Sequence, residues 1–314
     1  MRAALFLLFS MIVMILSAGC NSENVSEKNS ENIFYVAKDD NGREITLAQK
    51  PQRIVVTSAS FLEPLHAVGG EVVGRPTSKN KLPDFAKDAA DIGTVYQIDT
   101  EKLLACQPDL VIINKGMNEK LSDILDENKI PFLVLNMKSY DDVTKNIFTF
   151  GEITEQPELA VDIIESMDFK IQNVVRKIPP ELKRVAILHG TAQGLSVQLD
   201  NSIAGNVLQI LGWQNVASGM KATKDDGDTA PYSLETLVEQ NPEIIFVTSM
   251  GNLDEIKANI EKMISENPAW QTIPAIQDGK IYYLPQDLFL LSPGIHYPDA
   301  VKYMASLIYP EIKF

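Results

Sequence analysis

The imidazole groups are the side chains of this sequence best suited to bind a metal complex or to carry out acid–base chemistry, and there are three of them. His189 ends the apolar run RVAILHG, and residues at the carboxyl ends of strands in an open α/β sheet point toward the ligand crevice. His296 lies in LLSPGIHYPDA, a composition typical of an exposed, positioned loop. We therefore expect His189 and His296 near a ligand, although a structural role stays open for both. His66, in the amphipathic stretch LEPLHAVGG, is expected to be structural.

The same strand-end argument applies to polar residues that follow other apolar runs. Ser58 follows the first run, RIVV, and Lys115 follows the run LVIIN. Lys115 is the cation that we place near the mouth of a cleft. No run of lysine or arginine residues marks the expected cleft positions. Because anionic catecholate chelates usually need clustered cations, this lack of positive charge favours a less charged or tetrapyrrole-like ligand. The other residues expected to line the cleft are Thr57, Ser60, Asn114 to Met117, and Gln198 to Asp200.

Catalytic motifs are absent from the sequence. It contains no G-x-S-x-G elbow, no H-E-x-x-H pair and no glycine-rich phosphate loop after a strand. Without an assembled acid, base or nucleophile, we expect a binding protein with no intrinsic cofactor and not an enzyme, and a surface hydrolase is a remote alternative. The net charge of −14 argues against nucleic acid and against an anionic membrane surface as partners.

Residues 1–20 have the pattern of a secretory signal. Arg2 precedes an apolar run from Ala3 to Leu16, which is shorter than the roughly 20 residues that span a bilayer. The run leads into SAGC, which resembles the lipobox of bacterial lipoproteins, with Ser17 at the usual leucine position. The resemblance makes Cys20 the lipidated N-terminus of a cell-envelope protein on the extracytoplasmic face. Residues 21–32 have almost no apolar content and are expected to form a flexible tether.

Strand and helix signals alternate from residue 33 onward. Asp40-Asn41-Gly42 between two alternating runs indicates a β-hairpin. Short β-rich runs separated by helical stretches then predict βα units and mainly parallel sheets. From Pro157 to Ile178 apolar residues recur at helical spacing, so one long helix is expected. We predict an N-terminal α/β lobe at 33–156, a bridging helix at 157–178 and a C-terminal α/β lobe at 179–314.

Two segments of the chain repeat one pattern. DTEKLLACQPDLVII around Glu101 and SLETLVEQNPEIIFV around Glu235 both contain E-x-L, then P-[D/E] and an apolar strand. The repeat predicts an equivalent helix–strand unit in each of two similar Rossmann-like lobes.

From Ile33 to Pro310 the sequence resembles the iron-chelate and cobalamin-binding family of transporter-associated binding proteins. Four features carry the resemblance: the hairpin leading into P-x-R-I-V, the strand V-V-G-x-P-T-S at Val72 to Ser78, the repeated segments, and D-G-K-I-Y-Y-L from Asp278. The resemblance implies the class III periplasmic-binding-protein fold, in which a single long helix bridges two lobes and the ligand lies between them.

The resemblance also implies how the protein meets its transporter. Members of this family present one acidic residue at the tip of each lobe to basic pockets on two permease subunits, and these residues correspond to Glu101 and Glu235. Two separated carboxylates fix orientation and raise the on-rate more than they add affinity. A first-turn position favoured by the helix macrodipole is the other interpretation of each glutamate, and both can hold. The implied partners are the ABC permease dimer with its ATPase subunits and a small metal chelate.

Within the family, the sequence looks like the heme-binding lipoproteins of Gram-positive bacteria. Their axial methionine, five residues before the lobe-tip glutamate, is replaced here by Tyr96, and their histidine after the corresponding strand of the second lobe is replaced by Met250. Tyrosinate and thioether groups are both known axial ligands of heme iron, so either residue is a candidate ligand. The alternatives are that Tyr96 stacks on the ligand and that Met250 forms an apolar wall.

We therefore expect an extracytoplasmic solute-binding lipoprotein of an ABC importer that captures an iron complex. Heme is favoured, and cobalamin or a ferric siderophore is the alternative on the same scaffold. A surface signalling module with the same fold is a remote alternative.

Overall fold

The structure is a computed structural model that describes residues 33–78, 82–191, 194–224 and 227–314. Cys20 and the expected tether at 21–32 lie outside the described residues, so lipidation stays a prediction. Within the described ranges, no helix combines the length and the apolar character that crossing a membrane requires.

A β-hairpin opens the described chain. Strands β1 (Tyr35–Lys38) and β2 (Glu44–Leu47) pair antiparallel, which confirms the hairpin predicted at Asp40-Asn41-Gly42. Gly42 has a φ of 80°, a left-handed conformation that glycine adopts without steric cost.

The first sheet has its strands in the order β6-β5-β4-β3-β7-β8. All neighbours are parallel except β5 and β6, which form an antiparallel edge. Its strands are β3 (Ile54–Val56), β4 (Val72–Thr77), β5 (Ala90–Thr94), β6 (Gln97–Ile98), β7 (Leu110–Asn114) and β8 (Phe132–Leu135). Because helices cover both faces, the central strands are apolar on both sides.

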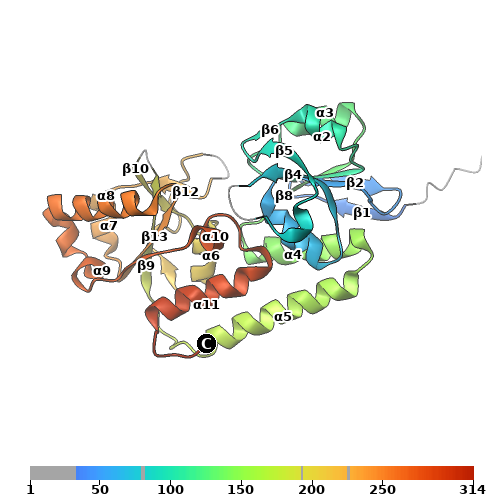
Figure 1. Cartoon of the computed structure of the whole chain (residues 1–314). Coiled ribbons are helices and arrows are strands. Elements are labelled where there is room, and N and C mark those ends of the chain that lie inside the picture. The colour runs from blue at the N-terminus through green and yellow to red at the C-terminus, as the bar shows by residue number, and fades with distance from the viewer. Residues whose placement is uncertain (1–32, 79–81, 192–193, 225–226) are drawn as a thin grey trace, which may run out of the picture. The chain divides into compact units, whose positions relative to one another are not determined.

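Four helices pack on this first sheet (Figure 1). They are α1 (Leu62–Ala67) and α4 (Tyr140–Thr154) on one face, and α2 (Thr100–Ala105) and α3 (Leu121–Glu127) on the other. Two 3₁₀ turns, η1 (Ala59–Phe61) and η2 (Asp84–Ala86), lie in the connections.

The second sheet has the order β12-β10-β9-β13-β14, and β11 pairs with the first residues of β9. Strands β9, β13 and β14 are parallel, as expected, whereas β10 runs antiparallel to both of its neighbours. The strands are β9 (Arg184–Thr191), β10 (Gly194–Gln198), β11 (Gln214–Asn215), β12 (Thr229–Pro231), β13 (Ile244–Ser249) and β14 (Ile281–Tyr283).

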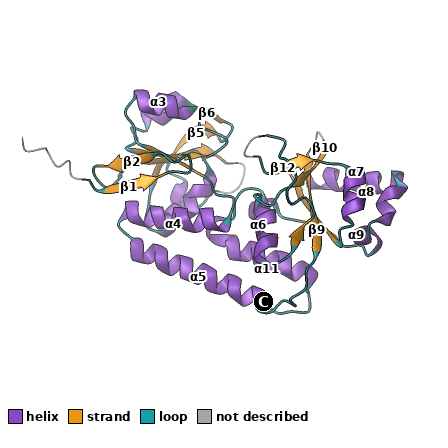
Figure 2. Cartoon of the chain, turned by 180° about the vertical axis from the view of Figure 1, so that it is seen from behind, coloured by secondary structure: helices purple, strands orange, loops and turns teal. Residues whose placement is uncertain are grey.

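Helices also cover both faces of the second sheet (Figure 2). The elements of this half are α6 (Ile203–Ile210), α7 (Leu234–Gln240), α8 (Leu253–Glu266), η3 (Pro268–Thr272), α9 (Pro274–Gln277), α10 (Gln286–Phe289), η4 (Gly294–His296) and α11 (Tyr297–Ile308). Buried side chains of α6 and α11 join the core that also contains one face of the first sheet.

The long helix α5 (Pro157–Val175) lies in sequence between the two sheets. It packs against α4 and α11, and the views in Figures 1 and 2 show α5 and α11 side by side. Pro157 occupies the first helical turn, where a missing N–H costs nothing. The helix ends three residues before the predicted Ile178, because the residue before a proline is disfavoured in the helical conformation. The lobe boundaries at 33–156 and 179–314 stay a prediction.

Candidate ligand-binding site

Tyr96 lies at the tip of the turn that joins β5 to β6. Its side chain is 65% exposed. Two side chains shape the turn: the Thr94 hydroxyl accepts a hydrogen bond from the Gln97 N–H at 3.2 Å, and the Asn118 amide donates to the Val95 carbonyl at 2.8 Å. Asn118 itself is buried. The turn therefore presents an exposed aromatic ring from a backbone that is anchored to the residues after β7.

His189 and Met250 lie close together at the ends of two adjacent parallel strands. The Met250 N–H donates to the Gly190 carbonyl at 2.9 Å, and the methionine side chain is 46% exposed. His189 is buried, with Nδ1 3.0 Å from the Thr248 hydroxyl. Because side chains alternate along a strand, His189 shares a face with Ile187, which belongs to the core that joins both halves. Burial lowers the pKa of His189, and the nearby Asp228 carboxylate opposes this effect.

Ser58 follows β3, where the strand-end argument placed it. It is buried, and its hydroxyl accepts from the Ser60 N–H at 3.3 Å and donates to the Ser60 hydroxyl at 3.1 Å. The Ser60 hydroxyl in turn donates to the Leu291 carbonyl at 2.8 Å. The Ser58 hydroxyl thus caps the 3₁₀ turn η1, and the hydrogen bond of Ser60 to Leu291 connects this turn to the C-terminal half.

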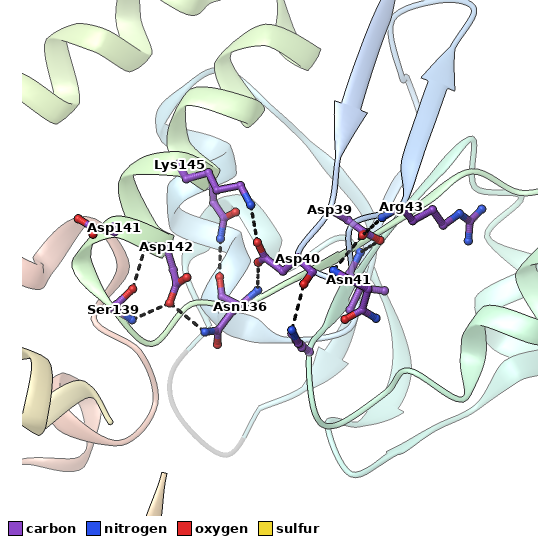
Figure 3. Close-up of polar contacts among 12 residues, drawn as sticks. Asp39, Asp40, Asn41, Arg43, Asn136, Ser139, Asp141, Asp142 and Lys145 are labelled. Carbon is purple, nitrogen blue, oxygen red and sulfur yellow. Dashed lines mark hydrogen bonds and ion pairs between the residues drawn. The ribbon is translucent and has the colours of Figure 1, made fainter. Parts of the chain in front are cut away.

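Lys115, the cation expected near the mouth of a cleft, has a partner within the first half. Its ammonium donates to the backbone carbonyl of Asp40 in the hairpin at 3.0 Å. The Asp40 carboxylate also accepts from the Asn136 N–H at 2.6 Å and is paired with Lys145 (Figure 3). Lys115 is therefore part of a network that anchors the hairpin to the first sheet. Strand-end reasoning places the backbone of a residue correctly but does not reveal such a long-range partner.

His296 ends the 3₁₀ turn η4, in the loop that leads into α11. Its Nε2 lies 3.2 Å from the Glu63 carboxylate and its Nδ1 lies 3.0 Å from the Asp299 carboxylate. The ring lines a hollow of about 320 Å³ together with α5 residues such as Asp162 and Lys170. The structure thus places His296 beside α5 and between two carboxylates, and its place near a ligand stays a prediction.

The segment 136–140, directly after β8, makes polar contacts with the C-terminal half. The Met137 carbonyl accepts from the Ser292 hydroxyl at 2.8 Å, and the Lys138 carbonyl accepts from the Tyr297 hydroxyl at 3.1 Å. The Lys138 ammonium lies 2.9 Å from the Asp228 carboxylate. The segment 136–140 was not predicted to line the site, although it follows β8 just as Lys115 follows the parallel strand β7.

Glu101 and Glu235 occupy matching positions in the two halves. Each is the second residue of its helix, and the caps Asp99 and Ser233 accept N–H bonds from the third residue, at 3.1 and 3.4 Å. The leucine two residues after each glutamate is buried, and the glutamate is exposed. Neither carboxylate forms an ion pair with any residue of the described part. The repeated sequence pattern therefore builds the same exposed acidic tip twice.

The backbones of His189 and Met250 lie close together near the ends of β9 and β13, whereas Tyr96 lies on the β5–β6 turn of the first sheet. Across residues 33–314, apart from the three short gaps, no group of three or more His, Cys, Asp or Glu side chains is arranged to hold a metal ion. The candidate site thus consists of one anchored aromatic turn, two adjacent strand ends and the polar segment after β8.

Two α/β halves, a long helix between them in sequence and the repeated acidic tips define a two-lobed binding protein. The chain belongs to the periplasmic binding protein family, whose sequence pattern matches residues 54–288. The family resemblance inferred from the sequence is confirmed, and so is the class III periplasmic-binding-protein fold.

Similar proteins share this organisation over nearly their whole length. The putative ABC transporter substrate-binding lipoprotein YhfQ of Bacillus subtilis is 21% identical over 313 residues, which cover 96% of both chains. The high-affinity heme uptake system protein IsdE of Staphylococcus aureus is 24% identical over 322 residues, which cover 100% of both chains. The crystal structure of S. aureus IsdE complexed with heme matches with a TM-score of 0.71 at 23% identity, over 82% of this chain and 98% of that one.

Proposed function

We propose that this protein is the substrate-binding component of an ABC importer and that it carries an iron-containing tetrapyrrole, with heme as the favoured ligand. The observation that carries the transport proposal is the matched pair of exposed, unpaired carboxylates, Glu101 and Glu235. A separated pair of like charges suits docking onto two basic pockets of a permease dimer. Lipidation at Cys20 would hold the protein at the extracytoplasmic face of the membrane.

The heme proposal is supported by the kinds of side chain at the strand ends and the β5–β6 turn. Tyr96 and Met250 are large side chains left 65% and 46% exposed, and each offers a known type of axial ligand for heme iron. Aromatic and methionine side chains are also common in the walls of small-molecule binding sites. Cobalamin or a ferric siderophore is the alternative ligand, because aromatic walls and a few polar groups also suit those chelates.

The proposal is tested by titrating the whole chain, purified in mild detergent, separately with hemin, cyanocobalamin and a ferric siderophore. Absorbance and melting temperature are followed in each titration. We expect saturable one-to-one binding of hemin with a shifted Soret band. Stabilisation by cobalamin or the siderophore alone would keep the transport function and remove heme as the ligand.

The substitution Tyr96→Phe tests the axial role, because it removes only the phenolic oxygen. We expect a changed heme spectrum and affinity lower by about tenfold, equivalent to about 1.4 kcal/mol. Tyr303→Phe on α11 is the matched control, since that tyrosine is also partly exposed but lies on another element. Identical spectra for Tyr96→Phe and wild type would leave Tyr96 as a stacking surface at most.

A further inference from the structure

The Lys138–Asp228 ion pair joins a residue that follows the first sheet to a residue that precedes β12 of the second. Its two charged atoms lie 2.9 Å apart, and the side chains are 36% and 34% exposed. Of the ion pairs that Lys or Arg forms with a carboxylate in the described ranges, this one connects the two halves. The pair is solvated, and such pairs contribute little to stability, so a competing anion can replace one partner.

The backbone around Lys138 is held in place by hydrogen bonds to the C-terminal half. Its carbonyl accepts from the Tyr297 hydroxyl, and the neighbouring Met137 carbonyl accepts from Ser292. On the other side, the Tyr140 N–H donates to the Asn206 side chain at 2.9 Å. The Lys138 side chain therefore extends from a backbone segment that is already ordered. Ordering a binding group in advance lowers the entropy cost of binding.

Two other cations of the first sheet have their partners within the first half. Lys115 donates to the Asp40 carbonyl. Arg75 is mostly buried, donates to the Ala86 carbonyl at 3.2 Å and pairs with Asp91. Lys138, in contrast, is paired with a carboxylate of the C-terminal half.

Asp228 also lies beside residues that the sequence predicts to line the ligand cleft. Its backbone carbonyl accepts a hydrogen bond from the Leu199 N–H at 2.8 Å, within the segment from Gln198 to Asp200. The Lys138 ammonium, paired with the Asp228 carboxylate, is therefore held beside this expected cleft wall. An anionic group on a ligand in that region would meet Lys138 and would compete with Asp228 for it.

We propose that Lys138 binds a carboxylate arm of the transported chelate and that Asp228 is the counter-ion it releases when the ligand arrives. The assignment rests on the proposed function and narrows it to chelates with free carboxylate groups. In the bound state, the Lys138 ammonium would form a charge-assisted hydrogen bond with a ligand carboxylate in place of the one with Asp228. The lysine therefore stays paired with an anion both before and after the ligand binds.

The test compares hemin, which carries two carboxylates, with hemin dimethyl ester, which carries none, on the whole chain in mild detergent. Lys138→Gln should weaken hemin binding about tenfold, equivalent to about 1.4 kcal/mol, and leave ester binding unchanged. Asp228→Asn should tighten hemin binding, because the internal competitor is gone. Lys262→Gln is the matched control, since Lys262 is an exposed lysine paired with Glu266 within α8.

Two results overturn the assignment while leaving the transport proposal intact: unchanged hemin affinity in Lys138→Gln, or an equal loss for hemin and its ester. A wild-type protein that binds neither compound removes the heme proposal and this assignment together. The assignment is supported if Lys138→Gln lowers the affinity for hemin but not for its ester, and if Asp228→Asn raises the affinity for hemin.

Discussion

At the scale of single residues, His189 is a buried imidazole near the end of β9, with its Nδ1 3.0 Å from the Thr248 hydroxyl. The buried imidazole of His189 makes stability depend on pH. Burial lowers its pKa below the ordinary value of 6.5, with Asp228 in opposition. As pH falls below about 6.5, the unfolded chain gains a proton that the folded protein does not yet bind. The stability that His189 contributes is therefore complete above about pH 6.5 and is lost as pH falls toward the folded-state pKa.

The expected outcome is that the melting temperature of wild type falls more between pH 7.5 and pH 5.5 than that of His189→Gln. Thermal unfolding by circular dichroism at both pH values measures the difference. His66→Gln is the control, because that imidazole is exposed and stacks on Phe85 at a ring distance of 3.7 Å. An equal fall in wild type and His189→Gln would show that burial of His189 is not linked to stability.

The sequence indicated which residues lie near strand ends, but it did not show what their side chains contact. His189 lies two residues before the end of β9, and Met250 directly follows β13. The Lys115 side chain contacts the hairpin, and the His296 side chain contacts carboxylates on α1 and α11. Local sequence patterns do not show such partners, because they depend on tertiary packing.

At the scale of elements, the apolar strands and the long helix were predictable, and the short polar strands β5, β6 and β12 were not. Strands β3, β7, β9 and β13 are continuous apolar runs, which suit sheets covered on both faces. Strand β5 contains Asp91 and Gly93, and β12 ends in Pro231, residue types that are rare in strands. The turn between β5 and β6 is held by the hydrogen bond from the Asn118 amide to the Val95 carbonyl, a partner distant in sequence.

Gly93, just before the β5–β6 turn, has a backbone conformation and surroundings in which any other residue would be strained. Gly93 has a φ of 96°, and a Cβ built there would lie 2.6 Å from the Gln97 carbonyl oxygen. Gly93→Ala should lower the free energy of unfolding by about 2–4 kcal/mol, because overpacking adds to the cost of the left-handed backbone. Gly42→Ala should cost about 1–2 kcal/mol, since Gly42 has a φ of 80° but open space around it.

Urea unfolding of both variants measures this difference, and hemin affinity of Gly93→Ala reports whether the turn still presents Tyr96. Equal losses of stability in the two variants would mean that the turn adapts to the added methyl group. In that case the presentation of Tyr96 would not depend on the close approach at Gly93.

At the scale of the whole molecule, the two exposed acidic tips are expected to act together. The Glu101→Lys, Glu235→Lys double variant places two positive charges where two basic permease pockets are proposed. Because like charges brought together at an interface cost several kcal/mol, we expect ligand uptake by cells to fall by about tenfold or more. Both residues lie exposed in the first turns of α2 and α7, so hemin affinity and melting temperature should stay close to wild type.

The matched control reverses two exposed glutamates at the opposite ends of helices, Glu127 in α3 and Glu239 in α7. This control variant carries the same change in net charge, so a general electrostatic effect on association would lower uptake in both variants equally. A fall confined to Glu101 and Glu235 identifies the helix starts themselves as the docking points. Full uptake by the Glu101→Lys, Glu235→Lys variant would contradict docking through these tips. The two carboxylates would then be explained by the helix macrodipole, which favours acidic residues at the first turn of any helix.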